Sequence, residues 1–343
     1  MKVRARAPLR LGFAGGGTDL SPYCDQHGGL VLNATIDLYA YATITPAARP
    51  VIRFAATDQQ VEAEYPLQPV VPADGPLRLH QGVYNRIVRE FRGGEPLAVE
   101  LVTASDAPAG SGLGASSTLV VAMISAFAEL LGLPLGEYDI ARLAYEIERI
   151  DLGLPGGRQD QYAAAFGGVN FIEFHPGDHI VVNPLRIKSW VLSEIEASTV
   201  LYYTGVARES GRIIMEQTDR ITRDDPAAVT ALHEIKEEAR HMKECVLRGD
   251  LARFARSMRK GWDAKQRTAS SVSTNVVDRA LAVAMEAGAS AGKVSGAGGG
   301  GFLMLFVDPV RRGDVGRALR ALDEGELFNC HFTRHGSKAW RVP

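Results

Sequence analysis

Eleven residues of this chain have the composition of a phosphate-binding loop. The segment Pro108-Ala-Gly-Ser-Gly-Leu-Gly-Ala-Ser-Ser-Thr118 contains three glycines and four hydroxyl side chains. An alternating stretch, Leu97 to Thr103, precedes it, and an apolar run, Leu119 to Leu131, follows it. Between a strand and a helix, glycines let backbone N–H groups point inward, and the helix start adds the positive end of its dipole. The segment therefore predicts a site for the phosphates of a nucleotide.

The segment differs from two common nucleotide-binding loops. A P-loop requires GxxxxGK[ST], and this segment contains no lysine. Gly110, Gly112 and Ala115 fit the dinucleotide pattern G-x-G-x-x-A, but that pattern requires a strand after the helix. Here a second helical stretch follows instead, Glu137 to Ile150. A glycine turn without a ligand is disfavoured by three glycines and three consecutive hydroxyl residues in front of an apolar helix.

Three segments together resemble the motifs of the GHMP small-molecule kinases, the family of galactokinase, homoserine kinase, mevalonate kinase and phosphomevalonate kinase. The loop described above resembles the phosphate loop of that family. Arg6-Ala-Pro-Leu-Arg-Leu-Gly-Phe-Ala-Gly-Gly-Gly-Thr-Asp19 resembles its N-terminal motif, and Lys293-Val-Ser-Gly-Ala-Gly-Gly-Gly-Gly-Phe302 resembles its third motif. The motifs occur in family order and span nearly the whole chain. The resemblance implies a kinase that uses ATP and Mg²⁺.

Two further stretches are most similar, within this family, to the bacterial D-glycero-D-manno-heptose 7-phosphate kinases. They are the opening through Gly28-Gly-Leu-Val-Leu-Asn33 and the stretch Gly156-Gly-Arg-Gln-Asp-Gln161. The resemblance implies phosphorylation of the anomeric hydroxyl of a sugar phosphate. Two alternatives stay open: a 1-kinase for galactose, fucose or an N-acetylhexosamine, and a sugar or ATP sensor that has lost catalysis.

The resemblance assigns Asp160 and Arg10 to catalysis. Asp160 matches the aspartate that orients or deprotonates the acceptor hydroxyl in the family. A carboxylate is a weak base toward an alcohol, but it can act if a nearby cation stabilises the developing alkoxide. Arg10, in the first motif, is the expected cation, and Arg158 is the alternative.

The resemblance also assigns residues to ATP and to the metal ion. Mg²⁺ keeps several waters and requires few protein oxygens. Ser116 matches the metal-binding serine of the family, with Ser117 as the neighbouring alternative, and Glu148 matches the second metal ligand, twelve residues before Asp160. The residues expected to bind ATP are Pro108, Gly110, Ser111, Gly112, Leu113, Gly114, Ala115, Ser116 and Ser117.

The predicted sugar site combines segments from both ends of the chain. Asp19 matches the residue with which galactokinases bind sugar hydroxyls. Galactokinases carry a bulkier Gly-Glu-His where this chain has Gly15-Gly-Gly17, so we expect a roomier or different sugar site. Glycines of the third motif should pass close to the sugar or the transferred phosphate. The predicted substrate-binding residues are Gly16, Gly17, Thr18, Asp19, Arg208, Gly298 and Gly299.

A phosphorylated sugar requires cations or backbone donors in its pocket. Arg208 and Arg212 are four residues apart, so on a helix they can share a face. Arg208 is the residue that we expect to bind the sugar phosphate. Lys265 and Arg267 form a second candidate group.

Composition limits the function classes. The chain has 343 residues, of which 46% are hydrophobic, enough for a sizeable core. A net charge of −2 without a basic block predicts no nucleic-acid partner. No apolar stretch is long enough to cross a bilayer, and the N-terminus lacks a signal-like apolar segment, so we expect a cytoplasmic protein without membrane contact. The expected partners are ATP and a small sugar phosphate, and the expected state is a monomer or homodimer.

Mixed strands and helices in two halves predict an α+β fold. Pro176, Gly177 and Pro184 interrupt the pattern, so we expect an ATP-binding kinase domain over residues 1–180 and a C-terminal kinase domain over 181–343. The resemblance implies a ribosomal-S5-like N-terminal half and a ferredoxin-like C-terminal half. The predicted strands are 29–46, 51–54, 61–65, 97–103, 169–174, 199–203, 302–307 and 328–342. The predicted helices are 80–91, 119–131, 137–150, 208–221, 226–247, 251–268 and 275–287.

Overall fold

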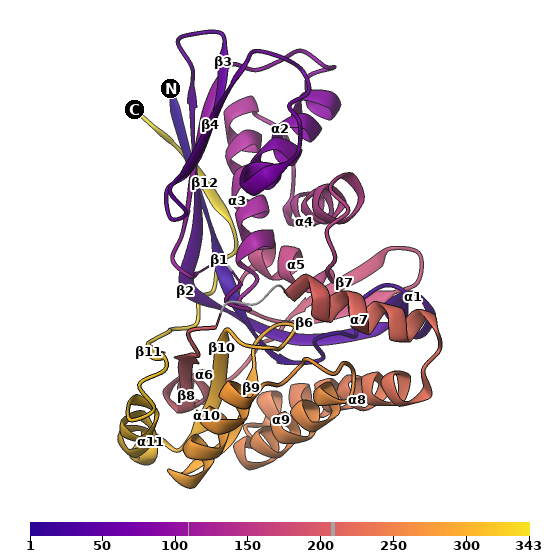
Figure 1. Ribbon diagram of the computed structural model, residues 1–343, viewed down its shortest axis with the longest axis vertical. Helices are drawn as coiled ribbons and strands as arrows, with labels where there is room; N and C mark the ends of the chain where they lie inside the picture. The colour runs from indigo at the N-terminus through magenta and orange to yellow at the C-terminus, as the bar shows by residue number, and fades with distance from the viewer. Residues whose placement is uncertain (109, 207–209) are drawn as a thin grey trace.

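A long mixed β-sheet dominates the first half of the molecule (Figure 1). The structure is a computed structural model that describes residues 1–108, 110–206 and 210–343. The sheet has the order β12-β1-β2-β5-β3-β4, and β6 joins it through β2 and pairs with β7. Its strands are β1 (Lys2–Ala14), β2 (Gly29–Pro46), β3 (Val51–Ala56), β4 (Val61–Pro66), β5 (Val99–Ser105), β6 (Val169–His175), β7 (His179–Pro184) and β12 (Lys338–Val342).

Strand β2 connects the parts of this sheet because it pairs with three other strands. It lies antiparallel to β1, while β6 pairs with its first half and β5 with its second half. The alternation of apolar residues predicts a strand over Gly29 to Pro46, and the structure has the same bounds. The first eight residues of β2 are all buried, because α3 and α8 from the two halves pack against it.

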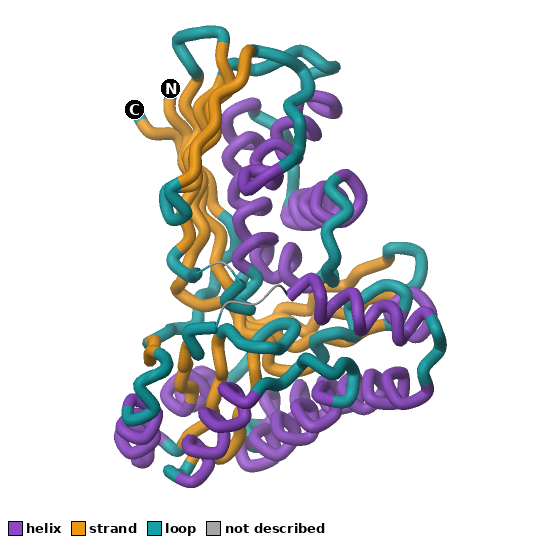
Figure 2. Tube along the Cα trace, viewed as in Figure 1, coloured by secondary structure: helices purple, strands orange, loops and turns teal. Residues whose placement is uncertain are grey.

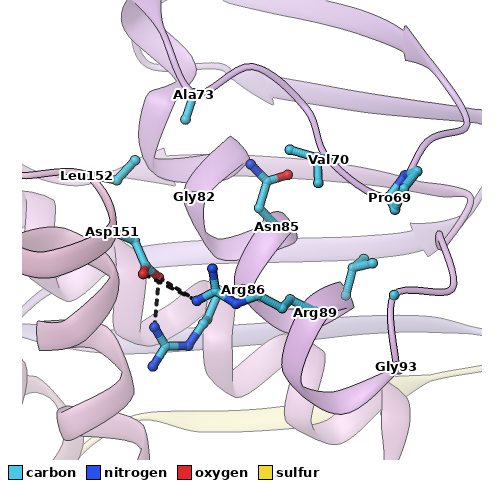
Figure 3. Close-up of a pocket in the computed structure, with 12 residues that line it drawn as sticks. Pro69, Val70, Ala73, Gly82, Asn85, Arg86, Arg89, Gly93, Asp151 and Leu152 are labelled. Carbon is cyan, nitrogen blue, oxygen red and sulfur yellow. Dashed lines mark hydrogen bonds and ion pairs between the residues drawn. The ribbon is translucent and has the colours of Figure 1, made fainter.

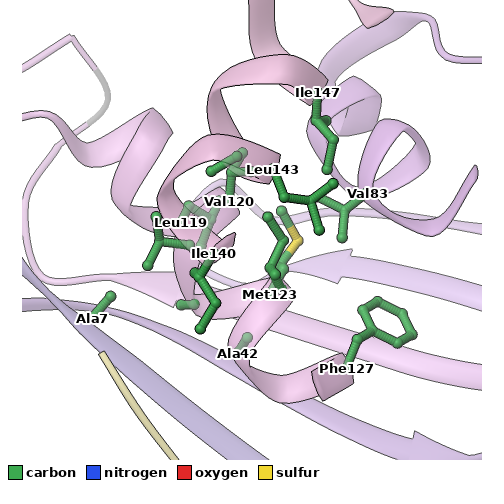
Figure 4. Close-up of a cluster of buried hydrophobic side chains, with 14 of the residues drawn as sticks. Ala7, Ala42, Val83, Leu119, Val120, Met123, Phe127, Ile140, Leu143 and Ile147 are labelled. Atoms are coloured by element: carbon green, nitrogen blue, oxygen red, sulfur yellow. The ribbon is translucent and has the colours of Figure 1, made fainter. Parts of the chain in front are cut away.

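Helices lie along one side of the long sheet (Figure 2), and α3 packs against β1, β2 and the neighbouring helices. They are α2 (Arg78–Phe91), α3 (Ala115–Leu131), α4 (Glu137–Glu146) and α5 (Gln159–Phe166), with the shorter α1 (Tyr23–His27) and η1 (Gly75–Leu77) elsewhere in this half. Figure 4 shows Met123 and Phe127 of α3 in one cluster with Ile140 and Leu143 of α4. Burying such side chains contributes roughly 1.5–3 kcal/mol each. This core fixes the start of α3, which directly follows the phosphate loop.

The helix predicted over residues 137–150 ends earlier than its amphipathic pattern indicates. The α-helix stops at Glu146, and one π-helical turn, η2 (Ile147–Asp151), follows. The N–H of Leu152 donates to the carbonyl of Ile147, five residues back, over 3.0 Å. Ile147 is buried in the π-helical turn, so the apolar stripe of the helix continues into the turn. The sequence pattern therefore does not reveal where the α-helix ends. Single π-turns often occur at functional sites, and this one carries Glu148.

The second half contains a four-stranded antiparallel sheet with helices packed on it (Figures 1 and 2). The sheet order is β11-β8-β10-β9. Its strands are β8 (Thr199–Tyr203), β9 (Ala289–Val294), β10 (Phe302–Val307) and β11 (Glu326–Phe328). The helices are α6 (Ser189–Ser198), α7 (Ser210–Thr222), α8 (Pro226–Arg248), α9 (Leu251–Gln266), α10 (Asn275–Glu286), η3 (Pro309–Arg311) and α11 (Arg312–Arg320). None of the helices described is long and apolar enough to span a membrane.

The C-terminal segment differs from its prediction as one strand over Phe328 to Val342. It forms two strands in different sheets, since β11 pairs with β8 and β12 pairs with β1. The two termini therefore lie close together at one end of the long sheet (Figure 1). Strand β7 crosses residue 180 and β12 lies beyond it, yet both belong to the first sheet. The division into residues 1–180 and 181–343 stays a prediction.

Candidate active site

The predicted phosphate loop joins β5 to α3. Gly110, Gly112 and Gly114 have φ values of 74°, 81° and 78°, a conformation that favours glycine. Gly114 is the last residue before α3, so Ser116 lies in the first helical turn and not at the cap. Ser116 is exposed, whereas the Ser117 side chain is buried. Ser116 is therefore accessible to solvent, and its role as a metal ligand stays a prediction.

The glycines of the third motif pack against other protein segments. A Cβ on Gly301 would collide with the carbonyl of Ser111 in the phosphate loop. The N–H of Gly299 donates to the carbonyl of Val272 over 2.7 Å, and a Cβ on Gly298 would lie 2.5 Å from the same carbonyl. These close approaches account for the glycines. The contact of Gly298 and Gly299 with the sugar stays a prediction.

Arg10 and Asp160 form an ion pair beside the phosphate loop. Nε and Nη2 of Arg10 each lie 2.6 Å from Asp160 Oδ1, and the Arg10 side chain is only 3% exposed. Nη1 of Arg10 donates to the carbonyl of Gly112 over 2.7 Å. A Cβ on Gly114 would lie 3.0 Å from Asp160 Cγ, so glycine there lets the loop approach the carboxylate. The predicted catalytic pair therefore borders the predicted phosphate site.

Arg10 lies where the pairing of β1 with β2 is irregular, because β2 has more residues than β1 between the paired positions. The register between β1 and β2 shifts between Pro8 and Arg10. The backbone N–H of Arg10 donates to the carbonyl of Leu113 over 3.1 Å, so β1 also contacts the phosphate loop through its main chain. Arg158, the alternative partner of Asp160, instead forms ion pairs with Asp25 and Asp178.

Asp19 caps the helix that carries Asp160. Asp19 Oδ2 accepts the N–H groups of Arg158 and Gln159, at 2.9 and 3.1 Å, where α5 begins. Oδ1 accepts the N–H of Gly17 at 3.1 Å and Nε2 of Gln159 at 3.2 Å. A carboxylate at a helix start satisfies free N–H groups and interacts favourably with the dipole. Asp19 is 2% exposed, so its contact with sugar hydroxyls stays a prediction.

Three further residues predicted to bind the sugar, Gly16, Gly17 and Thr18, are neighbours of Asp19 in the chain. The Thr18 hydroxyl is buried, donates to the Gly15 carbonyl over 2.8 Å and accepts the Leu30 N–H over 3.0 Å. The Gly16 carbonyl accepts Lys265 Nζ over 3.0 Å. Arg208 lies outside the residues that the structure describes.

The two predicted metal ligands lie next to each other. Ser116 Oγ is 3.3 Å from Glu148 Oε1, and the Glu148 side chain is buried. The other oxygen, Oε2, accepts Nε2 of Gln161 over 2.6 Å, and the same nitrogen lies 3.1 Å from Ser117 Oγ. Gln161 therefore holds the Glu148 carboxylate in place.

This donor set fits Mg²⁺. A hydroxyl and a carboxylate are the hard oxygen donors that Mg²⁺ prefers, and the ion takes its remaining ligands from water and phosphate. Within the described ranges, no three His, Cys, Asp or Glu side chains are arranged to hold a metal. The fit to Mg²⁺ rests on the two oxygen donors, Ser116 and Glu148.

A cavity of about 430 Å³ lies between α2, the loop before it and the π-turn (Figure 3). Figure 3 shows Asp151 paired with Arg86 and Arg89 at its wall, at 2.8 and 3.3 Å. Asp151 is the last residue of η2, the turn that carries Glu148. These ion pairs therefore help to fix the turn that carries Glu148, a predicted metal ligand.

Two lysines lie at the loop of the first motif. Besides the Lys265 contact with Gly16, Nζ of Lys293 donates to the carbonyls of Gly12 and Phe13, at 2.7 and 3.3 Å. Burial lowers the pKa of Lys265 to about 8, although Asp19 acts in the opposite direction. Burial, with repulsion from Lys265 and Arg10, lowers the pKa of Lys293 to about 7.

Sequence reasoning assigned no role to Gln161 or Lys293. Gln161 is a polar residue in front of the buried run Tyr162 to Ala165, and this position was the available signal. Lys293 opens the third motif, but its distance in sequence from Gly12 gives no sign of their contact. Both contacts arise only from the fold.

The two halves match the two domains of one enzyme family. Residues 78–168 match the GHMP kinases N terminal domain, and residues 242–324 match the GHMP kinases C terminal domain. Over 340 residues the chain is 47% identical to a D-glycero-alpha-D-manno-heptose 7-phosphate kinase of Campylobacter jejuni, with 99% of both chains covered.

Solved structures agree with this match. A crystal structure described as a D-glycero-D-manno-heptose 1-phosphate kinase from Bacteroides thetaiotaomicron has a TM-score of 0.85 and 46% identity, with 99% of both chains covered. Lactococcus lactis galactokinase in complex with galactose has a TM-score of 0.77, with 98% of this chain and 95% of that chain covered. At 17% identity, that likeness concerns the fold alone.

The fold and the site define an enzyme that transfers a phosphoryl group to an alcohol. The chain belongs to the GHMP kinase family. The predicted family, α+β fold and kinase activity are confirmed, and ATP is the donor that the family implies.

Proposed function

We propose that this kinase phosphorylates the anomeric hydroxyl of D-glycero-D-manno-heptose 7-phosphate and forms the 1,7-bisphosphate. The observation that carries the proposal is the Arg10–Asp160 pair, held against Gly112 and Gly114 of the phosphate loop. The identity of 47% to a heptose 7-phosphate kinase along the whole chain supports the choice of sugar.

The site residues would have two kinds of role in the reaction: they position the reactants, and they accept the proton of the acceptor hydroxyl. The acceptor oxygen forms a bond to the γ-phosphorus of ATP, the bond from that phosphorus to the β–γ bridging oxygen breaks, and ADP leaves. Asp160 receives the hydroxyl proton, since its Oδ2 accepts no hydrogen bond from the described residues. Arg10 stabilises the developing negative charge on the acceptor oxygen and keeps Asp160 in place.

The phosphate loop would hold the ATP phosphates through its backbone N–H groups and the start of α3. Ser116 and Glu148 would hold Mg²⁺, and Gln161 would orient Glu148. Mg²⁺, when bound, neutralises phosphate charge. Phosphoryl transfer depends mostly on positioning and charge stabilisation, so these residues account for the chemistry without a covalent enzyme intermediate.

The names of the two relatives place the phosphate of the sugar at different carbons, C7 in one and C1 in the other. A coupled assay of ADP release distinguishes the possibilities. We expect high kcat/KM for heptose 7-phosphate and low values for heptose 1-phosphate, galactose, fucose and an N-acetylhexosamine. Preference for any other member of this panel would contradict the proposed substrate. ATP binding without turnover on any of them would identify a sensor.

A further inference from the structure

Three cations, Arg10, Lys265 and Lys293, lie near one another at the first motif, residues 6–19. Arg10 contacts the phosphate loop, Lys293 contacts the Gly12 and Phe13 carbonyls, and Lys265 contacts the Gly16 carbonyl. They come from β1, β9 and α9, so only the folded chain brings them together. Arg10 forms an ion pair with Asp160, and the proposed phosphoryl transfer assigns no role to the two lysines.

The two lysines have carbonyl partners but no ion pair among the described residues. Asp19 is the carboxylate near Lys265, and its two oxygens already accept four N–H donors. Lys265 is 7% exposed and makes one hydrogen bond with its three donors. An ammonium group that is buried without a counter-charge is unfavourable. The pKa values of both lysines, lowered chiefly by burial, agree with this imbalance.

The ammonium group of Lys265 lies against Gly17 of this loop. A Cβ on Gly17 would lie 2.8 Å from Lys265 Nζ, so this ammonium group occupies the place of a side chain at Gly17. A small cavity, about 20 Å³, lies between the Phe13–Gly16 segment and α9, and both lysines line it. None of its lining residues is acidic. The cavity has room for about one water molecule and not for a phosphate, so a phosphate can reach the lysines only if their side chains leave the carbonyls that they contact.

We propose that Lys265, assisted by Lys293, binds the phosphate group of the phosphorylated sugar acceptor. This assignment rests on the proposed function, because it needs an acceptor that carries a phosphate. A series of hydrogen bonds connects Lys265 to α5, the helix that carries Asp160. Lys265 donates to Gly16, and Asp19 accepts the N–H groups of Gly17 and of Arg158 at the start of α5. A sugar held over this loop can therefore present its hydroxyl to Asp160 and its phosphate to the lysines. Charge-assisted hydrogen bonds to phosphate are stronger than those to the carbonyls.

The test compares Lys265→Met and Lys293→Met with Lys260→Met, an exposed lysine on the same helix as Lys265. Methionine keeps the length of the side chain and removes its charge. In the Lys265 variant, KM for heptose 7-phosphate should rise at least about tenfold, and in the Lys293 variant by a smaller factor. KM for ATP and kcat should change by less than about threefold, and Lys260→Met should match the wild type.

Binding measurements keep the test independent of turnover. Calorimetry with heptose 7-phosphate should show weaker binding to both variants, whereas heptose without its phosphate should bind all four proteins equally. Wild-type KM in both variants, or an equal rise in KM for ATP, would overturn the assignment. Equal kcat/KM of the wild type for heptose and heptose 7-phosphate would instead contradict the proposed function itself.

Discussion

A single substitution at Asp160 can remove the charge of the side chain while its shape is kept. Asp160→Asn keeps the size of the side chain but removes the proton acceptor and the charge that faces Arg10. We expect kcat to fall by roughly 10²–10⁴, with binding of a non-hydrolysable ATP analogue nearly unchanged. Steady-state kinetics and calorimetry measure the two quantities.

Asp178→Asn is the matched control, because Asp178 is exposed and pairs with Arg158. It should leave kcat unchanged. If Asp160→Asn turned over at a near-normal rate, Asp160 would not be the base.

Ser116 and Glu148 are predicted to hold one ion. Ser116→Ala and Glu148→Gln should each raise the Mg²⁺ concentration at half-maximal activity. The effects in the double variant should be less than additive, since residues that act on one ligand are coupled. Mg²⁺ titrations of the wild type, the two single variants and the double variant form the cycle. Strictly additive effects would mean that the two residues act separately.

The titration of Lys293 should make the free energy of unfolding depend on pH. Its pKa is about 7 in the folded protein, below the ordinary value of 10.5, because of burial and of Lys265 and Arg10 nearby. The unfolded chain therefore binds more protons at this site between about pH 7 and pH 10, and stability rises with pH across that window, by up to about 1.4 kcal/mol per pH unit.

Lys293→Met removes this titration, so its Tm minus the wild-type Tm should decrease as pH rises from 7 to 10. Thermal melting of both proteins at several pH values measures the difference, in which the titrating groups that do not interact with Lys293 cancel. A constant difference would show that Lys293 titrates near its ordinary pKa.

Sequence reasoning at the residue scale identified side chains better than their partners. It selected Arg10 over Arg158 as the partner of Asp160, and the structure places Arg10 there. It assigned Asp19 to the sugar hydroxyls, which stays a prediction, and it did not predict the contact of Asp19 with the start of α5. The difference arises because a cap supplied from 140 residues away leaves no local pattern.

At the scale of elements, the start of α5 sets the position of Asp160. Gly157 lies directly before this helix start, and a Cβ there would collide with the Asp19 carboxylate. Gly157→Ala should therefore displace Asp19 from the N–H groups of α5 and misplace Asp160. We expect kcat to fall at least about tenfold, since a shift of about 1 Å at a reacting group costs this much or more.

Gly313→Ala provides the control, because a Cβ at Gly313, near the start of α11, meets only ordinary contact. Kinetics and thermal melting should be measured for both variants. Wild-type kcat in Gly157→Ala would refute the role of this contact in positioning Asp160.

Periodicity located most elements but not their local geometry. The strand over Gly29 to Pro46 was predicted with its observed bounds because alternation is strong there. The π-turn at Ile147 to Asp151 was not predicted, since its apolar stripe is the same as that of an α-helix. The C-terminal segment was read as one strand, because alternation does not reveal that a chain leaves one sheet for another.

At the scale of the whole molecule, the active site depends on contacts between the two halves. Ser111 of the phosphate loop accepts the N–H of Phe302, and Arg10 donates to Ser295 Oγ over 3.3 Å. The order of the three motifs predicted a site shared by both ends of the chain. It could not predict that β12 completes the first sheet, because strand pairing at this separation is decided by packing and not by local sequence.

The position of the new phosphate tests the central claim most directly. Heptose 7-phosphate, ATP and Mg²⁺ are incubated with the enzyme, and the products are followed by ³¹P NMR, with Asp160→Asn as the control. The account predicts one new phosphate ester resonance, coupled to the anomeric proton, that forms together with ADP and in equal amount, while the 7-phosphate resonance persists. A new ester at any other carbon, or ADP formed without a second ester, would contradict it.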